Sequence, residues 1–140
     1  MITQLICSLD NLAERPIWTT SSLKDRLPVL QNWLVECDRN HSDCTSQTLK
    51  TSHPPSFPAR MLDVGTSGST AKLCRYTVQW GQRYTALSHC WGGNQLLTTT
   101  VATLSQRMQC IDLALFPKTF QDAIKITRLL NIRYLWIDSL

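Results

Sequence analysis

The apolar and small residues between positions 60 and 90 fall into three short runs separated by turn residues. The runs cover Arg60–Val64, Lys72–Val78 and Tyr84–Cys90, with glycine-containing turns between them. Short runs bounded in this way predict β-strands. We expect the first two to form an antiparallel hairpin beside the third. The third run is almost entirely apolar or small, which predicts a central strand.

Elsewhere the apolar residues recur with helical spacing. One helix is predicted from Leu27, with Pro28 in its first turn, because apolar residues repeat every three or four positions afterwards. Residues 101–110 are weakly helical. The clearest helix follows Pro117, where Thr119 and Asp122 approximate a capping box, and its apolar face comprises Phe120, Ala123, Ile124, Thr127 and Leu130.

Asn131 stands where this last helix needs a left-handed residue to end, and the strand Arg133–Ile137 follows at once. A helix that leads straight into a buried strand is the second half of a βαβ unit, so this strand should run parallel to Tyr84–Cys90. The predicted fold is α/β, a mostly parallel sheet with flanking helices, preceded by a helix and a short hairpin. We expect a helical and linker region over 1–58, in which residues 1–21 are irregular, and a domain over 59–140, incomplete because the chain stops directly after a strand.

Composition narrows the function classes. The chain of 140 residues has a net charge of +4, from 14 Lys and Arg against 10 Asp and Glu, and the basic residues are scattered. This pattern indicates neither nucleic-acid binding nor a polybasic membrane surface. There is no apolar run of about 20 residues for a membrane span, and the N-terminus lacks the features of a secretory signal. We therefore expect a cytoplasmic protein whose six cysteines are reduced.

Polar side chains follow both strands of the predicted βαβ unit. Ligands of open α/β sheets gather at the carboxyl ends of parallel strands. The sequence therefore predicts a ligand-side rim, formed by Ser88, His89, Cys90, Trp91, Gly92 and Gly93 after one strand and by Asp138 and Ser139 after the other.

Three more specific kinds of site, a nucleophile–base pair, a zinc site and a phosphate-binding loop, have weaker support in the sequence. Ser88 and His89 are strand neighbours that point to opposite faces, so they cannot pair as nucleophile and base, and packing explains Cys90 better. Cys37, His41 and Cys44, with His53 as a fourth ligand, have an irregular spacing for zinc, and packing also accounts for Cys37. The glycines after Trp91 lack a phosphate-loop pattern. We expect no metal and no cofactor in this chain, and its catalytic residues stay unassigned.

Two stretches of the chain are similar to a known family. YTALSHCWGG and FPKTFQDAIKITRLLNIRYLWIDSL resemble the heterokaryon-incompatibility (HET) domain of filamentous fungi, and the resemblance extends over roughly Trp33 to Leu140. His89 stands where that family usually has tyrosine, and Asn131 where it usually has glycine. The chain also stops before the family's next acidic segments.

The resemblance implies a role in non-self recognition and programmed cell death. HET domains look like remote relatives of TIR domains, some of which cleave NAD, so the full domain is expected to bind an NAD-like nucleotide and to act as an NAD glycohydrolase. The acidic catalytic residue would then lie beyond Leu140, and this fragment alone would be inactive. The alternative is a non-catalytic module that self-associates or docks a protein partner.

Overall fold

The computed structural model describes residues 2–6, 22–41, 58–75, 83–90 and 97–140, with only the backbone of the first segment. Two compact units are present. One contains helix α1 (Leu23–Asn40), and the other combines Ile2–Ile6 with the chain from Ser56 to Leu140. The second unit contains the sheet and both segments of the predicted rim.

Helix α1 begins four residues earlier than the periodicity predicts. The carboxylate of Asp25 accepts hydrogen bonds from the backbone N–H and the hydroxyl of Ser22, at 2.8 and 2.9 Å, and so fixes the start of the helix. Pro28 therefore lies inside the helix and not in its first turn. The prediction of a helix here is confirmed, but its predicted start is wrong.

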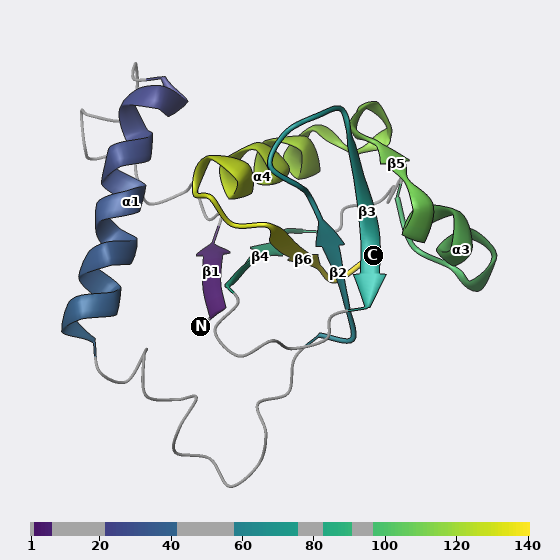
Figure 1. Ribbon diagram of the computed structural model, residues 1–140, viewed down its shortest axis with the longest axis horizontal. Coiled ribbons are helices and arrows are strands. Elements are labelled where there is room, and N and C mark those ends of the chain that lie inside the picture. The colour runs from purple at the N-terminus through teal and green to yellow at the C-terminus, as the bar shows by residue number, and fades with distance from the viewer. Residues whose placement is uncertain (1, 7–21, 42–57, 76–82, 91–96) are drawn as a thin grey trace, which may run out of the picture. The chain divides into compact units, whose positions relative to one another are not determined.

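The described residues of the second unit form a six-stranded sheet in the order β1-β4-β6-β2-β3-β5 (Figure 1). Its strands are β1 (Ile2–Ile6), β2 (Arg60–Asp63), β3 (Thr70–Arg75), β4 (Tyr84–Ser88), β5 (Ile111–Asp112) and β6 (Tyr134–Ile137). Two helices accompany them, α3 (Val101–Gln109) and α4 (Lys118–Leu129), together with a short 3₁₀ helix, η2 (Leu113–Leu115).

The α/β class is confirmed, and β4 and β6 run parallel as the βαβ pattern predicts. The expectation of a mostly parallel sheet is wrong. Only β1–β4 and β4–β6 are parallel pairs among the described strands, whereas β6–β2, β2–β3 and β3–β5 are antiparallel. The reason is the β2–β3 hairpin, whose short turn allows only antiparallel pairing. This hairpin extends the sheet from β6, and not from β4 as expected.

The segment 1–21 was predicted to be irregular, and this prediction is wrong for Ile2–Ile6. These residues form β1, which pairs in parallel with β4 and makes β4 an interior strand. The rest of that segment lies outside the described residues. An interior position agrees with the burial of β4, in which every residue from Tyr84 to Leu87 is buried.

Side chains of the sheet alternate between two apolar clusters. Leu87, Leu135 and Ile137 pack with Phe120 and Ile124 of α4 in the larger cluster. On the other face Met61, Tyr84 and Ala86 form a smaller cluster with Cys74, Tyr134 and Trp136. Helix α4 therefore covers one face of the parallel strands (Figure 1).

A buried polar contact also ties α4 to the sheet. The hydroxyls of Thr85 on β4 and Thr127 on α4 lie 2.7 Å apart, and both residues are fully buried. This pair fixes the height of α4 along β4, because a shift of the helix would separate two buried hydroxyls and leave that of Thr85 only a long hydrogen bond of 3.4 Å to the carbonyl of Tyr134.

Both ends of α4 are set by the backbone. Pro117 caps its start without a side-chain hydrogen bond, so the predicted capping box at Thr119 and Asp122 is wrong. At its other end Asn131 has φ of 57°, which confirms the left-handed residue expected there. The N–H groups of Asn131 and Ile132 bond to the carbonyls of Arg128 and Thr127, the pattern of a Schellman motif.

Candidate functional site

The two halves of the predicted rim meet at the carboxyl ends of β4 and β6. Leu87 of β4 is in register with Ile137 of β6, so the residues that follow these two strands emerge at the same edge. There the Nδ1 atom of His89 lies 3.9 Å from the Oδ1 atom of Asp138. This distance is too long for a hydrogen bond but close enough for an electrostatic contact.

His89 is held by α4. Its ring meets the ring of Phe120 edge to face, with centroids 4.9 Å apart and an angle of 87° between the planes. Phe120 lies in the first turn of α4 and is buried, so the imidazole rests on the core while its Nδ1 side faces Asp138. The side chain of His89 is 12% exposed and that of Asp138 is 37% exposed.

Two buried polar atoms of the rim have no hydrogen-bond partner within the described part of the chain, His89 Nδ1 and Ser139 Oγ. The backbone carbonyl of Ser139, in contrast, accepts a hydrogen bond of 2.9 Å from the N–H of Thr99. The segment around Ser139 is therefore fixed by its backbone, while its buried hydroxyl has no partner among the described residues. Buried polar atoms without partners are rare in folded proteins, and a bound ligand is one reason for their presence.

The guanidinium of Arg107 lies next to Thr99, the residue that bonds to the backbone of Ser139. Arg107 of α3 donates a hydrogen bond of 2.9 Å to the hydroxyl of Thr99, and burial lowers the pKa of Arg107 from its ordinary value. The rim thus combines an imidazole, a carboxylate and a hydroxyl. The guanidinium of Arg107 is connected to it through Thr99, which bonds to both Arg107 and Ser139. Of His89, Asp138 and Ser139, Asp138 is the most exposed, so its carboxylate is the group that a polar ligand reaches most easily.

Other residues of the predicted rim are less defined. Ser88 ends β4 and is exposed, and Cys90 is exposed and unpaired with another cysteine. His89 packs on Phe120 of α4, and Leu87 belongs to the apolar cluster on the same side of the sheet, so the intervening Ser88 points to the other face by strand alternation. This is the geometry on which the rejection of a nucleophile–base pair rests. Trp91, Gly92 and Gly93 lie outside the described residues.

The sequence did not single out Phe120 or Thr99 for the rim. A signal for Phe120 was present, because the helix of a βαβ unit begins at the edge where the first strand ends. Thr99 had no comparable signal, since its position depends on a loop between β4 and α3.

The zinc alternative, which the sequence disfavours, is not tested by the described residues. Cys37 lies in α1 and His41 caps that helix, whereas Cys44 and His53 are outside the described residues. Among the residues that are described, no group of three or more His, Cys, Asp or Glu side chains could hold a metal ion. No helix in the described ranges is long and apolar enough to cross a bilayer.

Comparison with known proteins agrees with the sequence resemblance. Residues 84–140 match the family model described as Heterokaryon incompatibility protein (HET). This range begins at the start of β4 and includes every residue of the rim. Comparisons with curated proteins and with solved structures gave no match.

Proposed function

We propose that this chain, whose residues 84–140 form a HET-family segment, acts in non-self recognition that ends in programmed cell death of a fungal cell. Its rim is the ligand-side edge of the domain, and the ligand is an NAD-like nucleotide. The observation that carries this proposal is the convergence of His89, Asp138 and Ser139 at one sheet edge inside the family segment.

The chemistry of the rim supports a nucleotide of this kind. Asp138 can accept hydrogen bonds from ribose hydroxyls, and His89 Nδ1 and Ser139 Oγ are buried polar atoms able to bond further groups of the ligand. The first turn of α4 lies beside His89 through Phe120, and the positive end of a helix favours a phosphate nearby. A cytoplasmic location belongs to the same proposal, because that compartment holds the nucleotide.

The test is to express the full-length protein in fungal cells and to measure both viability and cellular NAD. We expect death accompanied by loss of NAD and release of nicotinamide. Asp138→Asn should abolish both effects, because it removes the carboxylate while keeping the shape of the side chain. Glu36→Gln makes the same chemical change on an exposed side chain of α1, where it should leave both effects intact.

The outcomes separate two readings. Death without loss of NAD would contradict the enzymatic part and favour the alternative, a module that self-associates or binds a protein partner. Equal behaviour of Asp138→Asn and Glu36→Gln would contradict the assignment of the rim. A TIR-like relationship also stays a proposal, and the antiparallel pairs β6–β2 and β2–β3 depart from the parallel sheet that it implies.

A further inference from the structure

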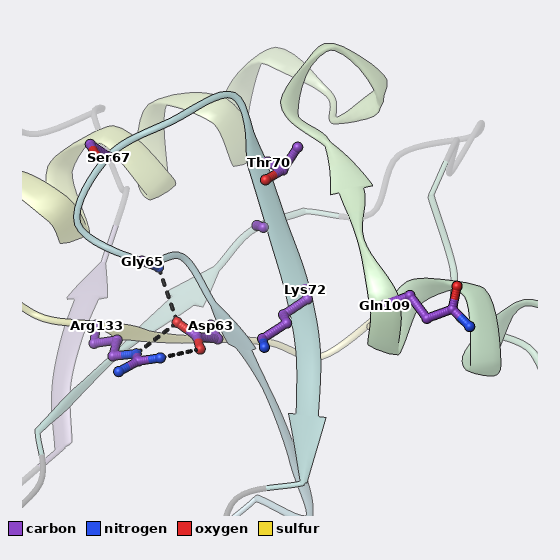
Figure 2. Close-up of a pocket in the computed structure, with 8 residues that line it drawn as sticks. Asp63, Gly65, Ser67, Thr70, Lys72, Gln109 and Arg133 are labelled. Atoms are coloured by element: carbon purple, nitrogen blue, oxygen red, sulfur yellow. Dashed lines mark hydrogen bonds and ion pairs between the residues drawn. The ribbon is translucent and has the colours of Figure 1, made fainter.

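A separate pocket lies at the opposite end of the strands from the rim, where β6 begins and β2 ends. Its volume is about 330 Å³. Figure 2 shows Arg133, Asp63 and Lys72 gathered below the loop that joins β2 to β3, with Gln109 apart on the other side of β3. The remaining lining residues are Gly65, Ser67, Thr70 and Ala71.

The only carboxylate that lines this pocket in the described structure is already bonded. Asp63 accepts hydrogen bonds from Arg133 Nε at 2.9 Å and from the second guanidinium nitrogen at 2.8 Å, and a third from the N–H of Gly65 at 3.0 Å. Asp63 is 7% exposed, so water has little access to it. The carboxylate is therefore not available to bind a cation.

The groups that remain available are positive. Lys72 is the cross-strand neighbour of Asp63 and is exposed, and the side chain of Arg133 is 61% exposed. One carboxylate against two cations leaves the pocket with an excess positive charge. Lys72 forms no ion pair with a carboxylate among the described residues, because the carboxylate of Asp63 is already bonded to Arg133.

The β2–β3 loop adds hydrogen-bond donors. Some of its carbonyls are occupied: Arg128 bonds to those of Val64 and Gly68 and to that of Thr70 at the start of β3, and the N–H of Leu113 bonds to that of Ser69. The N–H groups of residues 66–69 have no partner in the ranges that the structure describes.

Both glycines of this loop adopt a left-handed backbone, Gly65 with φ of 61° and Gly68 with φ of 93°. Successive N–H groups in a turn of this kind form a concave site for anions. Ser67 lies between these two glycines and lines the pocket, so its N–H group is a donor that a ligand there can use.

We propose that this pocket binds the phosphate group of a small molecule. Lys72 and Arg133 supply the charge, and the N–H group and the hydroxyl of Ser67 supply directed hydrogen bonds. A volume of about 330 Å³ is at the lower end for ligand pockets, which restricts the occupant to an inorganic phosphate or a small phosphate ester.

The proposal is tested by titrating the full chain with inorganic phosphate and with glycerol 3-phosphate, at constant ionic strength, while amide NMR shifts are recorded. We expect saturable shifts at residues 66–69 with at least one probe. Tighter binding of the ester identifies a phosphorylated small molecule, and equal or tighter binding of inorganic phosphate identifies the free ion. Sodium chloride at matched ionic strength should leave these signals unchanged.

Lys72→Ala should weaken binding by about tenfold or more, because it removes one charge-assisted hydrogen bond. Lys125→Ala removes an exposed lysine of α4 that does not line the pocket, and its affinity should equal that of the unmodified chain. Ser67→Ala is a second variant, expected to weaken binding several-fold. Absence of saturable shifts with both probes, or equal affinities of Lys72→Ala and Lys125→Ala, would overturn the proposal.

Discussion

Arg128 connects the last turn of α4 to the β2–β3 loop, and we expect its loss to destabilise the fold measurably. Its Nε and one terminal nitrogen bond to the carbonyl of Val64 at 2.8 and 2.6 Å. Further bonds reach the carbonyls of Gly68 at 2.8 Å and Thr70 at 3.1 Å. One side chain thus bonds to two carbonyls of the loop and to one at the start of β3, all more than 50 residues away in sequence.

The magnitude follows from the burial of these acceptors. A hydrogen bond to a charged group contributes about 1.5–3 kcal/mol when it is shielded from water. Only the contact with Val64 is part-buried, whereas the carbonyls of Gly68 and Thr70 are in exposed contacts and can bond to water instead. Arg128→Ala should therefore lower the free energy of unfolding by about 2–3 kcal/mol. Arg128→Lys keeps the charge but not the planar fork, so we expect a loss of about 1–2 kcal/mol.

Urea unfolding of the full chain measures this effect, with Lys125→Ala as the control on the same helix. For a domain of this size a loss of 2 kcal/mol corresponds to a midpoint lower by roughly 1 M urea. A difference below about 0.5 kcal/mol between Arg128→Ala and Lys125→Ala would refute the reasoning. It would mean that water replaces all of the Arg128 contacts without cost.

Three further predictions, which use substitutions at four other positions, test the fold. The side-chain hydrogen bond from Arg133 lowers the pKa of Asp63, although burial opposes this shift. The ionised carboxylate therefore stabilises the fold above about pH 4, and this stabilisation is lost as the pH falls through the pKa of the folded state. In Asp63→Asn the urea midpoint should change less between pH 3 and 7 than in the unmodified chain. Thr127→Val should cost about 1–2 kcal/mol in urea, and adding Thr85→Val should restore most of it; a cycle without coupling would contradict the buried pair. Asn131→Gly should gain about 0.5 kcal/mol and raise Tm, whereas an unchanged or lower Tm would argue against strain at φ of 57°.

Local signals in the sequence predicted the elements near the rim. The periodicity after Pro117, the left-handed position of Asn131 and the strand that follows define a βαβ unit, and such a unit has few alternative arrangements. From this unit alone, His89 and Asp138 were placed at one edge, and the structure brings their side chains within 3.9 Å. Ser22 and Asp25 form a capping box that could also have predicted the start of α1, but the apolar spacing favoured a start at Leu27.

The pairing of distant strands could not be read in the same way. Nothing local to β2 says that it pairs with β6 and not β4, and Ile2–Ile6 becomes a strand only because β4 offers a free edge. Strand pairing depends on packing of the whole sheet, which outweighs the preference of a short segment. The ion pair between Asp63 and Arg133 could not be predicted for the same reason, because its members are 70 positions apart and meet only through the pairing of β2 with β6.

Helix α4 links the two candidate sites, because its first turn supports the rim and its last turn supports the β2–β3 loop. Phe120 packs against His89, and Arg128 bonds to carbonyls of the loop that contains Ser67, a donor to the anion in our proposal. Twelve helical residues span about 18 Å, so no small ligand can contact both ends. The sites are therefore chemically separate while they share one rigid support. It follows that Arg128→Ala should disturb phosphate binding without removing any group of the rim, whereas Asp138→Asn should act on the rim alone.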